Sequence, residues 1–166
     1  MILAGLHSTH LTLECPLRII SKKAVAENSA DWLLIELKNA HQRVLSGLEK
    51  LDELLARPTP DLQSYLALRR ELSSASRARS SAVQAAHDHI IEHADQAAEV
   101  ELSRALHARR QMMGLSADHL STWSGWVIAA NWSRHRSAQR ALRSHWLDLI
   151  ELEQSVLYPM LQQRAG

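Results

Sequence analysis

Three histidines and two acidic residues lie close together in the stretch AAHDHIIEH, which runs from Ala85 to His93. His89 and His93 are four residues apart, so on a helix they lie on one face and could share a divalent ion. A zinc site needs three or four ligands, and the others would have to come from another part of the fold. Two interpretations stay open: a metal or partner-binding patch, or a helix bordered by histidines. We favour the second.

The same letters admit an enzymatic interpretation, which we set aside. The spelling His89-Ile-Ile-Glu92-His93 fits the H-x-x-E-H pattern of inverted zinc peptidases. Those enzymes have large folds of mixed helices and strands. A five-residue match to the pattern also occurs easily by chance in a chain with 10 histidines. Nucleophile chemistry has little support either, because the single Cys15 has no evident base and there is no G-x-S-x-G turn or glycine-rich phosphate loop. We therefore expect that the protein is not an enzyme.

Apolar residues recur every three or four positions, the spacing that turns one face of a helix toward a core. The first such stretch runs from Asp31, the expected N-cap, to Arg57-Pro58, where a helix should end. Its core-facing positions are occupied by leucines, a valine and one histidine: Leu34, Leu37, His41, Val44, Leu48, Leu51 and Leu55.

Three more helices follow from the same pattern. After a turn at 58–61, the second helix is expected to reach about residue 95. The third is expected to run from near Glu99 to Trp123, with Gly114 as a weak point. The segment SGWVIAAN then connects it to a last helix, which is capped by Asn131 or Ser133 and reaches Met160.

Four long apolar-striped helices with short links predict an all-α fold, an antiparallel up-down four-helix bundle over residues 30–166. No segment shows the sustained alternation typical of strands. Residues 1–29 show neither periodicity and contain Pro16, so we expect an irregular N-terminal extension that is partly disordered.

Charge and hydropathy argue against two classes of partner, nucleic acids and membranes. Lysine and arginine number 19 against 18 acidic residues, so no global field attracts nucleic acid. No apolar run approaches the ~20 residues needed to span a bilayer, and the start MILAGLHSTH has no basic segment typical of a signal peptide. A lone cysteine fits a reducing compartment. We expect a cytoplasmic protein without nucleic-acid or membrane partners.

The last helix contains Glu153-Gln-Ser-Val-Leu-Tyr-Pro159, which resembles the closing signature of hemerythrin-like domains, the HHE cation-binding family. That signature typically reads H-x-x-x-E-E-x-x-L-(F or Y)-P. The segment ELKNAHQRVLSGLEKL resembles the family's opening motif and places His41 at a metal ligand. ALRRELSSASRARSSAV and RRQMMGL resemble its second and third helices in a bacterial branch, so that the likeness covers about residues 31–163.

The resemblance implies a four-helix bundle, usually with a non-haem diiron centre held by histidines and carboxylates. Carried over position by position, it leaves two ligands, His41 and Glu153. The other ligand positions hold Arg79, Val83, Met112 and Leu149. The resemblance thus implies a degenerate member without the standard diiron centre, a non-catalytic binding or regulatory module in a stress or redox response.

Arg79 is the most informative of these changes, because a guanidinium keeps its positive charge where a cation should bind. We expect it to pair instead with Glu153, and we expect both to converge with His41 inside the bundle.

Two alternatives remain at the sequence level. A metal sensor or an oxygen- or iron-handling protein could use a rebuilt iron or zinc site of His41, His107, His145 and Glu153. A helical adaptor could bind a protein partner or a second copy of the chain through a tryptophan-lined end, where Trp123, Trp126, Trp132 and Trp146 gather. Core packing is the simpler role for these tryptophans. The arginines Arg69, Arg70, Arg77 and Arg79 are expected to be solvated or to flank the seam, and binding of an acidic partner or a phosphate is the alternative.

Overall fold

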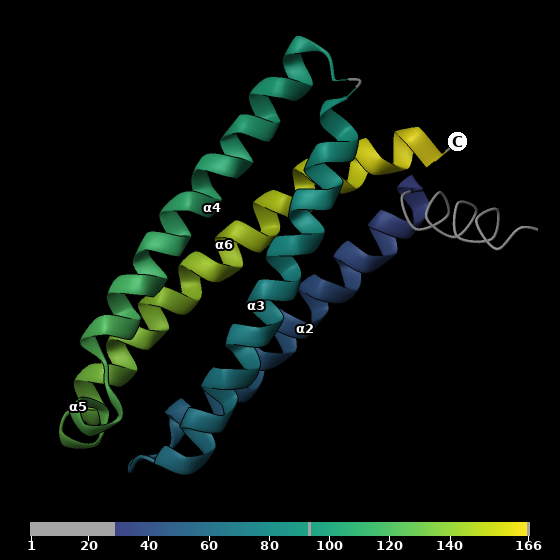
Figure 1. Ribbon diagram of the computed structural model, residues 1–166. Coiled ribbons are helices and arrows are strands. Elements are labelled where there is room, and N and C mark those ends of the chain that lie inside the picture. Colours follow the sequence, from purple (N-terminus) through teal and green to yellow (C-terminus); the bar gives the residue numbers. More distant parts are fainter. Residues whose placement is uncertain (1–28, 93, 166) are drawn as a thin grey trace, which may run out of the picture.

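A computed structural model describes residues 29–92 and 94–165, and within them the chain is all-helical, with no strand. Figure 1 shows the helices α2 (Ala30–Ala56), α3 (Leu62–Ile91), α4 (Gln96–Thr122), α5 (Gly125–Ala130) and α6 (Trp132–Ala165). The all-α prediction is confirmed. The expected irregular extension at 1–29 lies outside the described residues except for Ser29.

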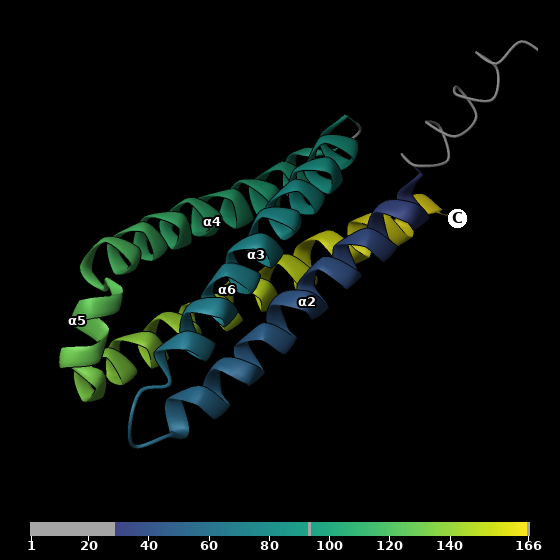
Figure 2. The same ribbon diagram turned by 60° about the horizontal axis from the view of Figure 1, so that its bottom comes forward.

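Successive long helices reverse direction, so that α2 and α3 lie side by side along most of their length (Figures 1 and 2). The last helix, α6, packs on both α2 and α4. The α3 and α4 helices, in contrast, diverge from the turn that joins them, as both views show. Side chains of four helices therefore meet around α6.

The helix starts follow from capping side chains, and one expected cap was wrong. Ser29, and not Asp31, caps α2, since its Oγ accepts a hydrogen bond from the Trp32 amide at 3.3 Å. Asp31 lies in the first turn, where its negative charge stabilises the helix by interacting with the positive end of the helix dipole. Asp95 accepts from the Ala98 amide at 2.8 Å, so α4 begins at Gln96 and α3 ends before residue 95.

The connection expected at SGWVIAAN contains a helix of its own. The Ser124 side chain accepts from the Val127 amide and starts the short α5. Asn131 closes α5, and α6 begins directly at Trp132. Periodicity could not find α5, because a six-residue helix is shorter than two turns.

The core has two apolar clusters with a polar layer between them. One cluster lies at the α2 N-terminal end and includes Leu37, Ile90, Leu102, Leu157 and Leu161. The other lies toward the opposite end of α2 and includes Val44, Leu48, Leu55, Tyr65, Trp123, Ile128, Trp132 and Ile150. Along α2, α3 and α6, the residues that separate the clusters are His41, Arg79 and Glu153.

Two helical glycines should respond differently to an added methyl group. Gly114 lies inside α4, and a Cβ there would meet nothing within 4 Å, so Gly114→Ala is expected to raise the free energy of unfolding by about 0.5–1 kcal/mol. A Cβ on Gly47 of α2 would lie 2.5 Å from Leu72 Cδ2 of α3, so Leu72 must move and the gain should shrink or reverse. Urea denaturation of both variants checks this. Equal stabilisation would show that α2 and α3 are not packed closely at Gly47.

Candidate functional site

A buried ion network joins three helices at the polar layer. His41 of α2, Arg79 of α3 and Glu153 of α6 are 1%, 1% and 0% exposed. Arg79 Nη1 donates a short hydrogen bond to Glu153 Oε2. His41 Nε2 donates to the same oxygen at 2.9 Å. The structure thus brings together His41, Arg79 and Glu153, whose convergence is expected from the apolar spacing together with the family resemblance.

The histidine extends the network to a tyrosine. Nε2 of His41 donates to the carboxylate, and the other ring nitrogen, Nδ1, forms a hydrogen bond with the Tyr158 hydroxyl at 2.8 Å. Burial, assisted by the Glu153 charge, raises the pKa of Tyr158, so this hydroxyl keeps its proton at neutral pH. A continuous chain of hydrogen bonds therefore links Tyr158, His41 and Glu153.

The guanidinium of Arg79 is held from a second side by Trp146 of α6, whose ring centroid lies 4.9 Å from Cζ. Two buried polar atoms of the network, Arg79 Nε and Glu153 Oε1, have no hydrogen-bond partner among the residues that the structure describes. The network is thus well packed but incompletely bonded.

The donor set does not fit a diiron centre. Iron in such centres is held by several hard carboxylate and imidazole donors, and here one imidazole and one carboxylate face a fixed cation. Val83, Met112 and Leu149, at the other ligand positions of the resemblance, are buried apolar side chains. Across residues 29–92 and 94–165, no group of three or more His, Cys, Asp or Glu side chains could hold a metal ion.

The other candidate histidines are not brought to this network. His107 of α4 and His145 of α6 are exposed, so the rebuilt site of His41, His107, His145 and Glu153 does not assemble. In the opening stretch, His89 is half-buried and its backbone carbonyl accepts from Arg164 Nη1 at 3.1 Å. His93 lies outside the described residues, and so does its pairing with His89.

A second polar cluster lies between α3, α4 and α6, and sequence reasoning missed it. His135 is 0% exposed, and its ring centroid lies 4.9 Å from that of Trp123, 5.0 Å from that of Tyr65 and 5.5 Å from that of His119. Neither ring nitrogen of His135 has a hydrogen-bond partner within the described chain. Spacing along α6 could not show this cluster, because it depends on two other helices that close over His135.

Burial controls protonation in this second cluster. Burial, with smaller contributions from His119 and Arg69, lowers the pKa of His135 to about 4. Burial also lowers the pKa of His119, although the neighbouring Gln139 side chain acts in the opposite direction. Burial raises the pKa of Tyr65 to about 12, and its hydroxyl donates to Gln139 Oε1 at 3.0 Å. At neutral pH all three rings are uncharged.

The tryptophans divide into core and surface. Trp123 and Trp132 are buried, and Trp132 Nε1 donates to the Arg57 carbonyl at 3.0 Å. Trp126 on α5 is 83% exposed. Packing is thus the observed role for the first two, while Trp126 is left free for another.

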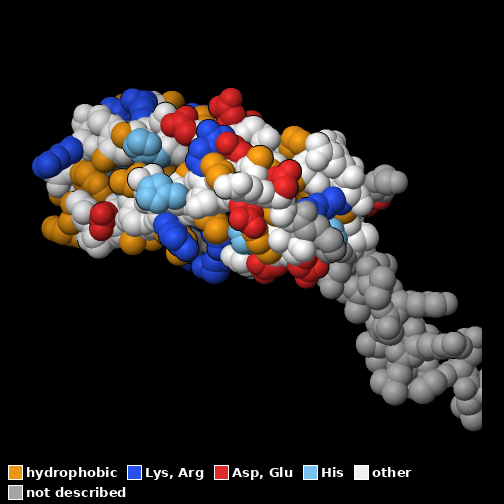
Figure 3. Space-filling model, turned by 90° about the horizontal axis from the view of Figure 1, so that it is seen from above, with side chains coloured by type: hydrophobic (Ala, Val, Ile, Leu, Met, Phe, Trp, Pro, Cys, Tyr) orange, Lys and Arg blue, Asp and Glu red, His pale blue; other side chains and the backbone are white. Residues whose placement is uncertain are grey.

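The arginine-rich segment of α3 is also divided. Arg70 and Arg77 are exposed, as expected. Arg69 is half-buried and donates to the Trp123 and Leu120 carbonyls at the C-terminal end of α4. On the face seen in Figure 3, basic and acidic side chains are interspersed, with no extended patch of one sign.

No family model, no curated protein and no solved structure matches the chain. None of the helices in the described part of the chain combines the length and the apolar character needed to cross a bilayer.

Proposed function

We propose that the chain is an antiparallel four-helix bundle of the hemerythrin-like type in which an ion network replaces the metal centre. It works as a non-catalytic binding or regulatory module in a stress or redox response. The observation that carries the proposal is the buried Arg79, which donates to Glu153 at the layer where the resemblance places iron ligands.

The charge of Arg79 supports this assignment. A guanidinium stays protonated in a protein, so a cation beside Glu153 would have to compete with a permanent positive charge already bonded to the carboxylate. The apolar side chains of Val83, Met112 and Leu149 supply no replacement donors. The network ties α2, α3 and α6 together where a metal would otherwise do so.

Metal analysis tests the proposal directly. Protein purified aerobically is expected to contain iron well below one atom per chain and to lack the absorption bands of an oxo-bridged diiron centre. Anaerobic addition of ferrous iron, followed by desalting, should leave this result unchanged. Near-stoichiometric iron with oxo-bridged bands would overturn the proposal.

A helical adaptor is the second candidate, favoured by the exposure of Trp126 on the short α5. In this function the α5 end binds a partner protein or a second copy of the chain. Sedimentation of the purified chain, with Trp126→Ser as the variant, tests the second copy. A concentration-dependent dimer that the variant abolishes would support the adaptor, and an unchanged monomer would count against self-association.

A further inference from the structure

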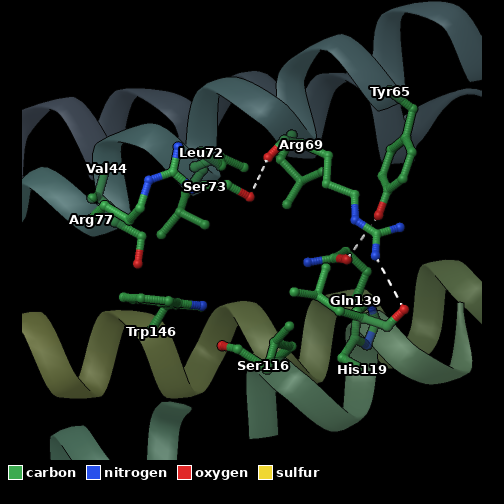
Figure 4. Close-up of a pocket in the computed structure, with 15 residues that line it drawn as sticks. Val44, Tyr65, Arg69, Leu72, Ser73, Arg77, Ser116, His119, Gln139 and Trp146 are labelled. Carbon is green, nitrogen blue, oxygen red and sulfur yellow. Dashed lines mark hydrogen bonds between the residues drawn. The ribbon is translucent and has the colours of Figure 1, made fainter. Parts of the chain in front are cut away.

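A cavity of about 280 Å³ opens between α3 on one side and α4 and α6 on the other, next to the two polar clusters. Figure 4 shows its walls: Tyr65, Arg69, Leu72, Ser73 and Arg77 follow one another along α3, and Ser116, His119, Gln139 and Trp146 face them. The cavity lies in the region where α3 and α4 diverge.

The walls combine an apolar body with positive charge. Val44, Leu48, Leu51 and Leu142 supply aliphatic surface, and Trp146 supplies an aromatic face. Among the described residues that line the cavity, only Arg69 and Arg77 carry formal charges, and none is an aspartate or glutamate. A bound molecule would thus meet hydrocarbon on most sides and positive charge at two separate points along α3.

Hydrogen-bonding groups at the cavity are left unused. Ser116 Oγ and His119 Nε2 are shielded from solvent and have no partner, although buried polar atoms are nearly always paired. Arg77 makes no ion pair or hydrogen bond within residues 29–92 and 94–165. Arg69, in contrast, donates hydrogen bonds from both Nη atoms to the backbone carbonyls of Trp123 and Leu120. Arg77 and Ser116 therefore both offer free donors to a bound molecule.

We propose that this cavity binds a small amphipathic monocarboxylate, with its aromatic or short hydrocarbon body against the leucines and Trp146 and its carboxylate toward Arg77 and Ser116. The inference deepens the proposed function, because it names a ligand class for the binding module. Only the biological role of the ligand rests on the proposed function, and the cavity itself does not. A carboxylate suits a guanidinium and a hydroxyl that both donate, whereas a cation would find no counter-charge among the lining residues.

Trp146 connects the cavity to the buried ion network. One side of this residue borders the cavity, and its ring also lies against the Arg79 guanidinium. A ligand in the cavity therefore contacts a residue that touches the Arg79–Glu153 pair. The indole N–H signal of Trp146 is the natural reporter of occupancy.

Titration with 3-phenylpropionate, its neutral amide 3-phenylpropanamide and the cation 3-phenylpropylamine tests the inference. We expect saturable calorimetric binding of the acid, at least about tenfold weaker binding of the amide, and none of the amine, with a shift of the Trp146 indole signal only for bound ligands. Arg77→Gln should abolish the preference for acid over amide, and Ser116→Ala should weaken binding of the acid. Arg70→Gln, an exposed arginine of α3 outside the lining, should leave both unchanged.

Three results would overturn the inference: no saturable binding of the acid at millimolar concentration, equal binding of acid and amide, or a response of Arg70→Gln equal to that of Arg77→Gln. Arg77 is exposed, so its replacement should leave the fold intact, and the circular dichroism spectrum checks this. Metal analysis does not depend on these titrations. If the protein contains iron and still binds the acid, the proposed function is wrong and the ligand site stands. If the protein is iron-free and does not bind the acid, the ligand site is wrong and the proposed function stands.

Discussion

Replacing Glu153 with alanine is expected to lower the free energy of unfolding by about 3–5 kcal/mol, because the change leaves the buried charge of Arg79 without a counter-ion. The same change removes the acceptor of His41 Nε2. Urea denaturation at neutral pH, followed by circular dichroism, measures the loss. It is larger than the loss of one exposed ion pair, which is worth about 0–1 kcal/mol.

Glu151→Ala is the matched control, because Glu151 lies one half-turn away on α6 and is exposed. It should change stability by less than about 0.5 kcal/mol. The double variant Arg79→Met with Glu153→Leu should recover most of the loss, since removing both charges leaves no unpaired ion in the core. A mild effect of Glu153→Ala, equal to that of Glu151→Ala, would mean that Arg79 reaches solvent.

His135→Phe is expected to stabilise the protein and to remove most of its loss of stability in mild acid. The wild-type ring has a pKa of about 4 in the folded chain against 6.5 for an ordinary histidine, because burial disfavours its charged form. The unfolded chain thus takes up a proton first as the pH falls. The stabilising effect of the neutral ring is fully present above pH 6.5, falls as the pH drops below that value, and is lost by about pH 4. Over this range the free energy of unfolding falls by about 3 kcal/mol.

Phenylalanine keeps the ring contacts with Tyr65, Trp123 and Trp132 and removes two buried nitrogens without partners. Stability should therefore rise by about 1–3 kcal/mol at pH 7 and depend less on pH between 4 and 6.5. Urea denaturation at several pH values measures both effects. His107→Phe, at an exposed position of α4, is the control and should retain the wild-type slope. An unchanged slope for His135→Phe would show that His135 titrates in solvent.

The α2–α3–α6 network shows how far local pattern reaches. The 3.6-residue period places His41 on the same stripe as Leu37 and Val44, so its inward direction follows from the sequence. Arg79 lies on the α3 stripe in the same way. Their contact with one carboxylate also required the correct pairing of helices, which the order of the elements and the short turns made the simplest arrangement.

The second cluster and the cavity show where local pattern ends. His119 and His135 are 16 positions apart on different helices, and nothing in their spacing indicates that their rings lie 5.5 Å apart. The cavity exists because α3 and α4 diverge, and that angle depends on how both helices pack against α6.

By itself the sequence determined that this chain forms long helices and which side chains lie on their apolar stripes, since both follow from backbone geometry within a few turns. Only the tertiary structure decided which stripes meet and that His135 is completely buried. Those outcomes depend on side-chain packing between segments distant in the chain, where small changes in helix angle open or close space.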